Sequence, residues 1–155
     1  MLKTINGFKV FIVLTVLLFA GSNTPALAKG VCVFNVPEGW VQANTRWIGQ
    51  CCAGYADGLG ILKEYSNGIV IRFFLGRIKK GDIVFGVIDQ ADGYIAGKFV
   101  DGALLPSDDR QLHIDAFDEA GRAAKKAAEE FGESGNKASA QFYMKKAEEL
   151  FNQMD

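Results

Sequence analysis

Glycine recurs at a fixed spacing through the middle of this 155-residue chain. Two glycines five residues apart occur three times, and an aromatic residue precedes each pair by two or three positions. Another glycine follows the first two pairs, ten or eleven residues after their first glycine. Self-similarity at a period of about twenty to fifty residues is typical of a repeated structural unit. The glycine pairs are Gly49 and Gly54, Gly76 and Gly81, and Gly97 and Gly102; the aromatics are Trp47, Phe74 and Tyr94; the additional glycines are Gly60 and Gly86.

Turn signals and strand-forming runs alternate through the same region. Asp-Gly and Asn-Gly dipeptides supply the positive φ angles that tight turns between antiparallel strands require. The runs between them are rich in Ile, Val, Phe and Tyr, which favour strands. The sequence therefore predicts an antiparallel β-meander, in which an aromatic side chain can cover a neighbouring strand glycine. The predicted turns are Asp57-Gly58, Asn67-Gly68, Asp92-Gly93 and Asp101-Gly102, and the predicted strands are 60–65, 69–75, 83–88 and 94–100.

The three segments resemble the MORN repeat, over roughly Trp47–Gly102. They are WIGQCCAGYADGLGILKEYSNG, FFLGRIKKGDIVFGVIDQADG and YIAGKFVDG. The first unit is similar to that of exported bacterial MORN-like proteins, in which a cysteine lies about twenty residues before a Trp-x-Gly-x-Cys segment. The resemblance implies a role in interaction or scaffolding. It also implies these repeat positions: Trp47, Gly49, Gly54, Gly58, Gly60, Phe74, Gly76, Gly81, Gly86, Tyr94, Gly97 and Gly102.

The N-terminus has the pattern of a cleaved signal peptide, residues 1–28. Two lysines and no acid precede or adjoin an apolar run from Val10 to Ala20, and Ala26-Leu27-Ala28 places small residues at −3 and −1. The apolar run is too short to span a hydrocarbon core of about 30 Å as a helix. We expect cleavage after Ala28 and a periplasmic or secreted protein. The alternative is an uncleaved membrane anchor.

Three cysteines in an oxidising compartment leave one over after a disulfide forms. Cys51 and Cys52 are neighbours on an expected strand, so their side chains should point to opposite faces and only one can face Cys32. The family resemblance selects Cys51, which implies a Cys32–Cys51 disulfide and a free thiol at Cys52. We expect that thiol to be buried and inert, or alternatively to link two chains. A catalytic role is disfavoured because the one histidine, His113, lies about sixty residues away.

The composition changes near residues 105–108. Only three glycines follow Gly102, and the balance of basic to acidic residues changes from 8 and 7 in 29–106 to 7 and 11 in 107–155. Apolar residues then recur at steps of three and four, which predicts two helices: one capped by Asp115 and stopped by Gly132, and one over about 137–153. The predicted fold is α+β, with an antiparallel β-repeat region at 29–106 followed by an α-helical hairpin at 107–155.

The sequence leaves open what covers the two faces of the sheet and what buries the apolar stripe of the helical hairpin. The strands 69–75 and 83–88 are apolar on both alternations, which favours cover on both faces of the sheet. The helical hairpin could supply one cover by docking on the sheet. Its apolar stripe could instead bind another protein or a second copy of this chain. The lysines and glutamates opposite the stripe, including Lys125, Lys146 and Glu149, are interpreted as a solvated surface.

No enzymatic constellation stands out in the sequence. There is no Ser/His/Asp set, metal-ligand spacing or phosphate-cradling loop, so we expect a non-enzymatic protein with no cofactor and no metal. The acidic pairs Asp89 with Asp92, and Asp108 with Asp109, are interpreted as turn residues. Without Lys3 and Lys9 the chain carries 15 basic and 18 acidic residues, a net charge of −3, which favours neither nucleic acid nor an anionic membrane surface.

The predicted function is an exported repeat protein that binds a protein partner or an envelope component. The alternative is a small secreted inhibitor or effector that acts on another enzyme. The partner could also be a second copy of this chain, bound through the helical stripe or through Cys52.

Overall fold

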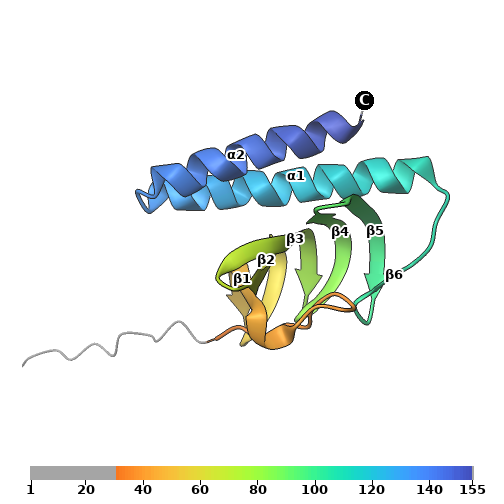
Figure 1. The fold of residues 1–155 in the computed structure, drawn as a ribbon, viewed down its shortest axis with the longest axis horizontal. Coiled ribbons are helices and arrows are strands. Elements are labelled where there is room, and N and C mark those ends of the chain that lie inside the picture. The colour runs from red at the N-terminus through yellow and green to blue at the C-terminus, as the bar shows by residue number, and fades with distance from the viewer. Residues whose placement is uncertain (1–30, 155) are drawn as a thin grey trace, which may run out of the picture.

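The computed structural model describes residues 31–154 (Figure 1). Six antiparallel strands form one sheet in chain order, and two helices follow them, so the predicted α+β fold is confirmed. The predicted signal peptide, residues 1–28, lies outside the described residues. The elements are a 3₁₀ turn η1 (Gln42–Asn44), β1 (Thr45–Cys52), β2 (Tyr55–Ser66), β3 (Ile69–Lys79), β4 (Asp82–Gln90), β5 (Gly93–Val100), β6 (Ala103–Leu104), α1 (Arg110–Glu133), α2 (Lys137–Phe151) and a 3₁₀ turn η2 (Asn152–Met154).

Four hairpins turn through two residues that both have positive φ. The first residue of each turn has a φ of 50–51° and the glycine that follows has a φ of 80–90°. Two positive φ angles match the right-handed twist of the flanking strands, and glycine adopts the second without strain. The four turns are Ala53-Gly54, Asn67-Gly68, Lys80-Gly81 and Asp101-Gly102.

Two of the four predicted turns are therefore confirmed, Asn67-Gly68 and Asp101-Gly102. The prediction for Asp57-Gly58 is wrong, because the chain has already turned at Ala53-Gly54 and β2 continues through both residues. The prediction for Asp92-Gly93 is displaced by one residue: the turn is Ala91-Asp92, and Gly93 is the first residue of β5.

Five glycines form one row across five neighbouring strands. They are successive cross-strand partners, and the four outside β2 have φ values of 149–158°, a conformation that side-chain-bearing residues rarely adopt. An ideal Cβ on the third glycine of the row would lie 2.7 Å from the Cα of the fourth. The row allows adjacent backbones of the curved sheet (Figure 1) to approach each other closely. Its members are Gly49, Gly60, Gly76, Gly86 and Gly97.

The helical hairpin docks on the sheet and supplies the cover of one of its faces. Helix α1 lies across β2 to β5, and α2 packs along α1 (Figure 1). Alanines of α1 pack with the buried strand residues Ile61, Leu75 and Val87, and Tyr143 and Leu150 of α2 complete this cluster. We call this side of the sheet the helix face. Small side chains on α1 allow the helix backbone to lie close to the strands.

The start of α1 differs from the prediction. The helix is capped by Asp109, whose Oδ1 accepts a hydrogen bond from Gln111 N at 2.9 Å, and it begins at Arg110. Asp115 lies one and a half turns inside the helix and accepts from the Gln111 side chain instead. The Asp109 carboxylate is the one that reaches an orphan N–H at the first turn, so capping selects it. Helix α2 begins at Lys137, as predicted, after a cap by Asn136.

The opposite face of the sheet is covered by the N-terminal strap, residues 31–41. The strap crosses the ends of three hairpins, and its amides donate to the three turn glycines that close the repeated pairs. Val33 N donates to Gly54 O at 2.8 Å, Asn35 N to Gly81 O at 2.8 Å, and Glu38 N to Gly102 O at 2.9 Å. We call this side the strap face. The residues packed there are Cys32, Phe34, Val36, Trp40, Trp47, Ala56, Leu62, Phe74, Ile78, Ile83, Ile88, Ile95 and Phe99.

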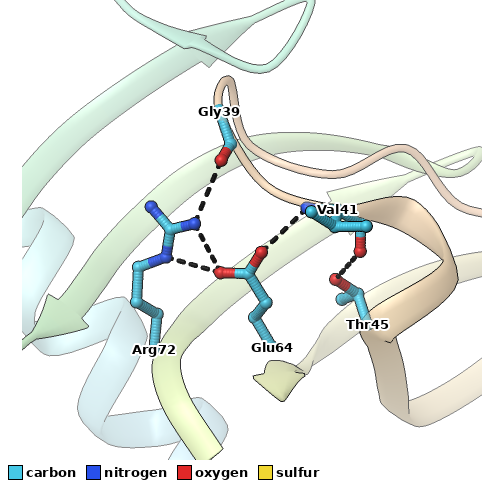
Figure 2. A network of polar contacts seen from close by, with 5 residues as sticks. All are labelled: Gly39, Val41, Thr45, Glu64 and Arg72. Carbon is cyan, nitrogen blue, oxygen red and sulfur yellow. Dashed lines mark hydrogen bonds and ion pairs between the residues drawn. The ribbon is translucent and has the colours of Figure 1, made fainter. Parts of the chain in front are cut away.

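A buried carboxylate fixes the C-terminal end of the strap (Figure 2). Glu64 is 2% exposed and accepts hydrogen bonds from Val41 N at 2.8 Å and from Arg72 Nε. The Arg72 guanidinium also donates to Gly39 O at 3.0 Å and lies over the Trp40 ring. A buried charge is tolerated when it is paired and hydrogen-bonded in this way. The network therefore holds the strap on β2 and β3.

Candidate functional site

Strand β1 is the longer of the two edge strands of the sheet. Within residues 31–154 it pairs with β2 alone, so the backbone groups along its other side face no further strand. The opposite edge is different, because β6 has only two residues. An eight-residue edge strand is a template on which an extended chain can form backbone hydrogen bonds.

A hollow of about 1290 Å³ lies along this edge, between β1 and the start of the strap. Its lining includes Phe34, Trp47, Gln50 and Asp57. A smaller hollow of about 380 Å³ is lined by Asn44, Arg46, Tyr65 and Gly68, among others. Arg46 lines both hollows and therefore marks the place where they adjoin.

Trp47 is a rigid wall of the larger hollow. An ideal Cβ on Gly49 or Gly60 would collide with the Trp47 ring, so the ring lies against both glycines and covers them. Its Nε1 donates to Gln50 O at 3.1 Å, which fixes the ring orientation. The expected cover of a strand glycine by an aromatic thus holds at the first unit.

The other two repeat aromatics lie differently. Phe74 is fully buried on the strap face and packs edge-on against Phe99, with ring centroids 5.6 Å apart. Tyr94 lies on the helix face and packs edge-on against Phe117. The reason is spacing: Tyr94 is three residues before Gly97, whereas the other aromatics precede their glycines by two. One extra residue on a strand reverses the face.

The structure joins Cys32 to Cys51, with their Cα atoms 5.7 Å apart, and Cys52 is a free cysteine. This is the pairing that the family resemblance implies, and it attaches the start of the strap to the end of β1. The expectation that Cys52 is buried is wrong, because this residue is exposed. Alternation turns Cys52 away from the face that Cys51 shares with Cys32, and it lies at the end of an edge strand.

Two cations are adjacent beside the open edge. Arg46 of β1 and Lys63 of β2 are cross-strand partners, so their side chains leave the sheet on the same face. Lys63 Nζ lies 5.1 Å from the centre of the Tyr143 ring, and burial lowers the pKa of this half-buried ammonium. Among the residues described, neither cation has a carboxylate within ion-pair distance.

Tyr143 carries a buried hydroxyl next to this pair. The residue is 1% exposed, and its hydroxyl has no hydrogen-bond partner within residues 31–154. Burial, with a smaller contribution from Tyr65, raises the pKa of the Tyr143 hydroxyl well above its usual range. Burial and the charge of Asp89 likewise raise the pKa of Tyr94.

Two charged residues have roles that the sequence interpretation missed. Asp89 is not a turn residue: it lies in β4, and its Oδ2 accepts from Lys146 Nζ at 2.8 Å. Lys146 is consequently no part of a fully solvated surface, since its side chain is only 15% exposed. Burial lowers its pKa, but hydrogen bonds with Asp89 and Glu149 outweigh that effect and raise it. Of the other acidic residues, Asp92 lies in a turn, Asp108 precedes α1 and Asp109 caps it.

His113 and Cys52 lie on different elements of the described chain: His113 is in the first turn of α1, whereas Cys52 is the last residue of β1. Residues 31–154 contain no group of three or more His, Cys, Asp or Glu side chains placed to hold a metal ion. Over the same residues, neither helix is both long and apolar enough to cross a membrane.

Comparisons of this chain with protein-family models, with curated proteins and with solved structures give no match. The site is therefore defined by its own geometry. That geometry combines an open strand edge, a hollow with a rigid aromatic wall and an adjacent pair of cations.

Proposed function

We propose that this chain is an exported, non-enzymatic MORN-like repeat protein that binds a protein partner or an envelope component through the open edge of β1. The observation that carries the proposal is the eight-residue edge strand beside a hollow of about 1290 Å³. An extended segment of a partner can add to such an edge by backbone hydrogen bonds, while the hollow receives its side chains.

The surroundings of β1 support this use. The disulfide, the strap and the Trp47 ring all contact β1 or its glycines, so the edge is held in one conformation before binding. A preorganised edge lowers the entropic cost of association. The contrast with β6 also supports it, since a two-residue strand offers too few backbone groups for a stable added strand.

The compartment is part of the proposal. A disulfide such as Cys32–Cys51 fits an oxidising environment rather than the cytosol. Together with the signal-peptide pattern of residues 1–28, it supports a periplasmic or secreted location. A binding site open to that compartment would meet other envelope or extracellular proteins.

Site-specific photo-cross-linking tests the proposal in cells that make the protein. A photoreactive amino acid replaces Gln50, which is exposed on β1, or Lys125, which is exposed on α1 and serves as the matched control. We expect a discrete cross-linked partner from position 50 and none from position 125, and we expect excess purified protein to compete with the cross-link.

Equal cross-linking from both positions, or none from position 50 while position 125 captures a partner, would contradict binding at β1. Turnover of a cell-wall or ester substrate that is abolished by His113→Ala or Cys52→Ser would contradict the non-enzymatic assignment. Inhibition of a foreign enzyme by the purified protein would favour the inhibitor alternative.

A further inference from the structure

The charge at the open edge is unbalanced. Arg46 and Lys63 face each other across β1 and β2, and like charges directly opposite one another on a sheet destabilise it. Their neighbours along the same cross-strand row are Phe73 on β3 and then Asp89 on β4. Asp89 is already paired with Lys146, so it leaves no free charge for Lys63.

Two acidic groups close to Lys63 in the sequence are also occupied. Glu64 follows Lys63 but projects to the other face, where it accepts from Arg72 and Val41 N. Asp57 lines the larger hollow, and its Oδ2 accepts from Lys80 N at 2.9 Å. Three other arginines of the described chain form ion pairs with carboxylates; they are Arg72, Arg77 and Arg122. Among the described residues, Arg110 forms no such pair either, but only Arg46 and Lys63 combine this lack with direct cross-strand pairing of two cations.

We propose that the segment that adds to β1 is an extended acidic stretch of a partner protein, with an Asp or Glu carboxylate bound between Arg46 and Lys63. This inference rests on the proposed function and names the chemistry of its partner. Arg46 presents a planar fork that matches a carboxylate, and the half-buried Lys63 strengthens the attraction because solvent screens it less.

A protein segment fits the edge better than an anionic membrane. Membrane surfaces are bound by broad clusters of four to eight cations, whereas two cations are adjacent here and the mature chain carries a net charge of −3 from 15 basic and 18 acidic residues. A strand edge also requires a ligand with its own N–H and C=O groups, which an extended peptide supplies.

The test uses two synthetic peptides of equal length that alternate Thr with either Glu or Gln, and the mature chain with its disulfide intact. Fluorescence anisotropy measures their binding to the unsubstituted chain, to the double variant Arg46→Gln with Lys63→Gln, and to Lys125→Gln, a control that removes one exposed cation away from the edge. Circular dichroism and thermal unfolding establish that each variant is folded. Vesicles of phosphatidylglycerol and a sedimentation measurement of the chain alone complete the set.

We expect the Glu peptide to bind at least tenfold more tightly than the Gln peptide, with the preference weakened by salt and lost in the Arg46/Lys63 double variant but kept in Lys125→Gln. Equal binding of both peptides would overturn the acidic preference and leave the β1 edge as a binding site. No binding of the Glu peptide, binding to vesicles alone, or occupation of the edge by a second copy would overturn the inference outright. Cross-linking from position 50 separates these outcomes from failure of the proposed function, because it does not depend on charge.

Discussion

The two faces of the sheet are covered in opposite ways. The helix face is covered by a contiguous hairpin whose alanines and aromatics pack side chain against side chain with Ile61, Leu75 and Val87. The strap face is covered by eleven residues that bind turn backbones, and a row of glycines brings the backbones of the strands together. The first arrangement depends on which side chains are present. The second also packs side chains but depends in addition on their absence at the glycine row, so it should tolerate atoms added to that row far less.

The largest expected effect is on the glycine row. In Gly76→Ala, the new Cβ would meet the Phe85 carbonyl and the Gly86 Cα, and a φ of 154° would be strained. Backbone strain and overpacking together predict a loss of about 2–5 kcal/mol in the free energy of unfolding, measured by urea denaturation. Gly132→Ala is the matched control on α1, where the nearest atom is Ala140 Cβ at 3.9 Å. The control should be neutral or stabilised by up to about 1 kcal/mol; similar losses at both positions would remove the contrast between the faces.

The disulfide gives the next largest effect. Replacing both Cys32 and Cys51 by Ser releases the strap from β1 and should lower the free energy of unfolding by about 3 kcal/mol. Cys52→Ser should change it by less than about 0.5 kcal/mol, because that residue is exposed. Denatured, unreduced protein should contain one reactive thiol. A large loss from Cys52→Ser, or a mapped Cys32–Cys52 peptide, would show that the strap is attached differently.

The Glu64 network should give a smaller effect. Glu64→Gln keeps the shape but removes the charge that Arg72 and Val41 N contact, at a cost of about 2 kcal/mol. The cost stays below that of a fully buried ion pair because the Arg72 side chain is 26% exposed. Glu130→Gln, which removes an exposed pair with Lys126 on α1, is the control and should change stability by less than about 0.5 kcal/mol. A control loss as large as that of Glu64→Gln would contradict this interpretation of the network.

The smallest expected effect is a gain in stability, from a substitution on the helix face. Tyr143→Phe removes a buried hydroxyl without a partner in the described chain, so stability at pH 7 should rise by about 1 kcal/mol. Burial raises the folded-state pKa of Tyr143 above the unfolded value of about 10, so the unfolded chain loses this proton first. Stability should therefore fall as the pH rises above about 10, and fall less in the Phe variant. Urea unfolding at pH 7 and at alkaline pH measures both; an unchanged alkaline slope would mean that the hydroxyl is solvated.

Much of the sheet could be predicted from sequence because glycine spacing reports backbone conformation directly. The helices followed from apolar periodicity, although the first cap was misplaced because Asp109 and Asp115 both have capping side chains. The implied disulfide predicted that the strap starts beside the first strand, but the course of the strap over the sheet could not be predicted. Its partners are the carbonyls of Gly54, Gly81 and Gly102, and a carbonyl acceptor leaves no mark on residue type.

The candidate site was only partly accessible from sequence. Trp47 and the cysteines stood out, but the selection of Cys51 came from the family resemblance and not from geometry. The cation pair needed the strand register, since Arg46 and Lys63 are seventeen residues apart. Arg46 lies three residues before Gly49, and Lys63 lies three residues after Gly60. Pairing Gly49 with Gly60 in antiparallel strands would therefore have placed Arg46 opposite Lys63. That signal was present in the glycine spacing.

Hydrogen exchange of the strap amides tests most directly whether the strap is a structural part of the sheet, bound at its turn glycines. In the oxidised protein, the amides of Val33, Asn35 and Glu38 should be protected, because each donates to a turn carbonyl. In the Cys32→Ser, Cys51→Ser variant, the Val33 amide should lose most of its protection. The Glu38 amide should keep most of its protection, because the Glu64 network holds that end of the strap, and the protection of the α1 amides should be unchanged. Fast exchange of all three strap amides in the oxidised protein, with α1 protected, would contradict the account.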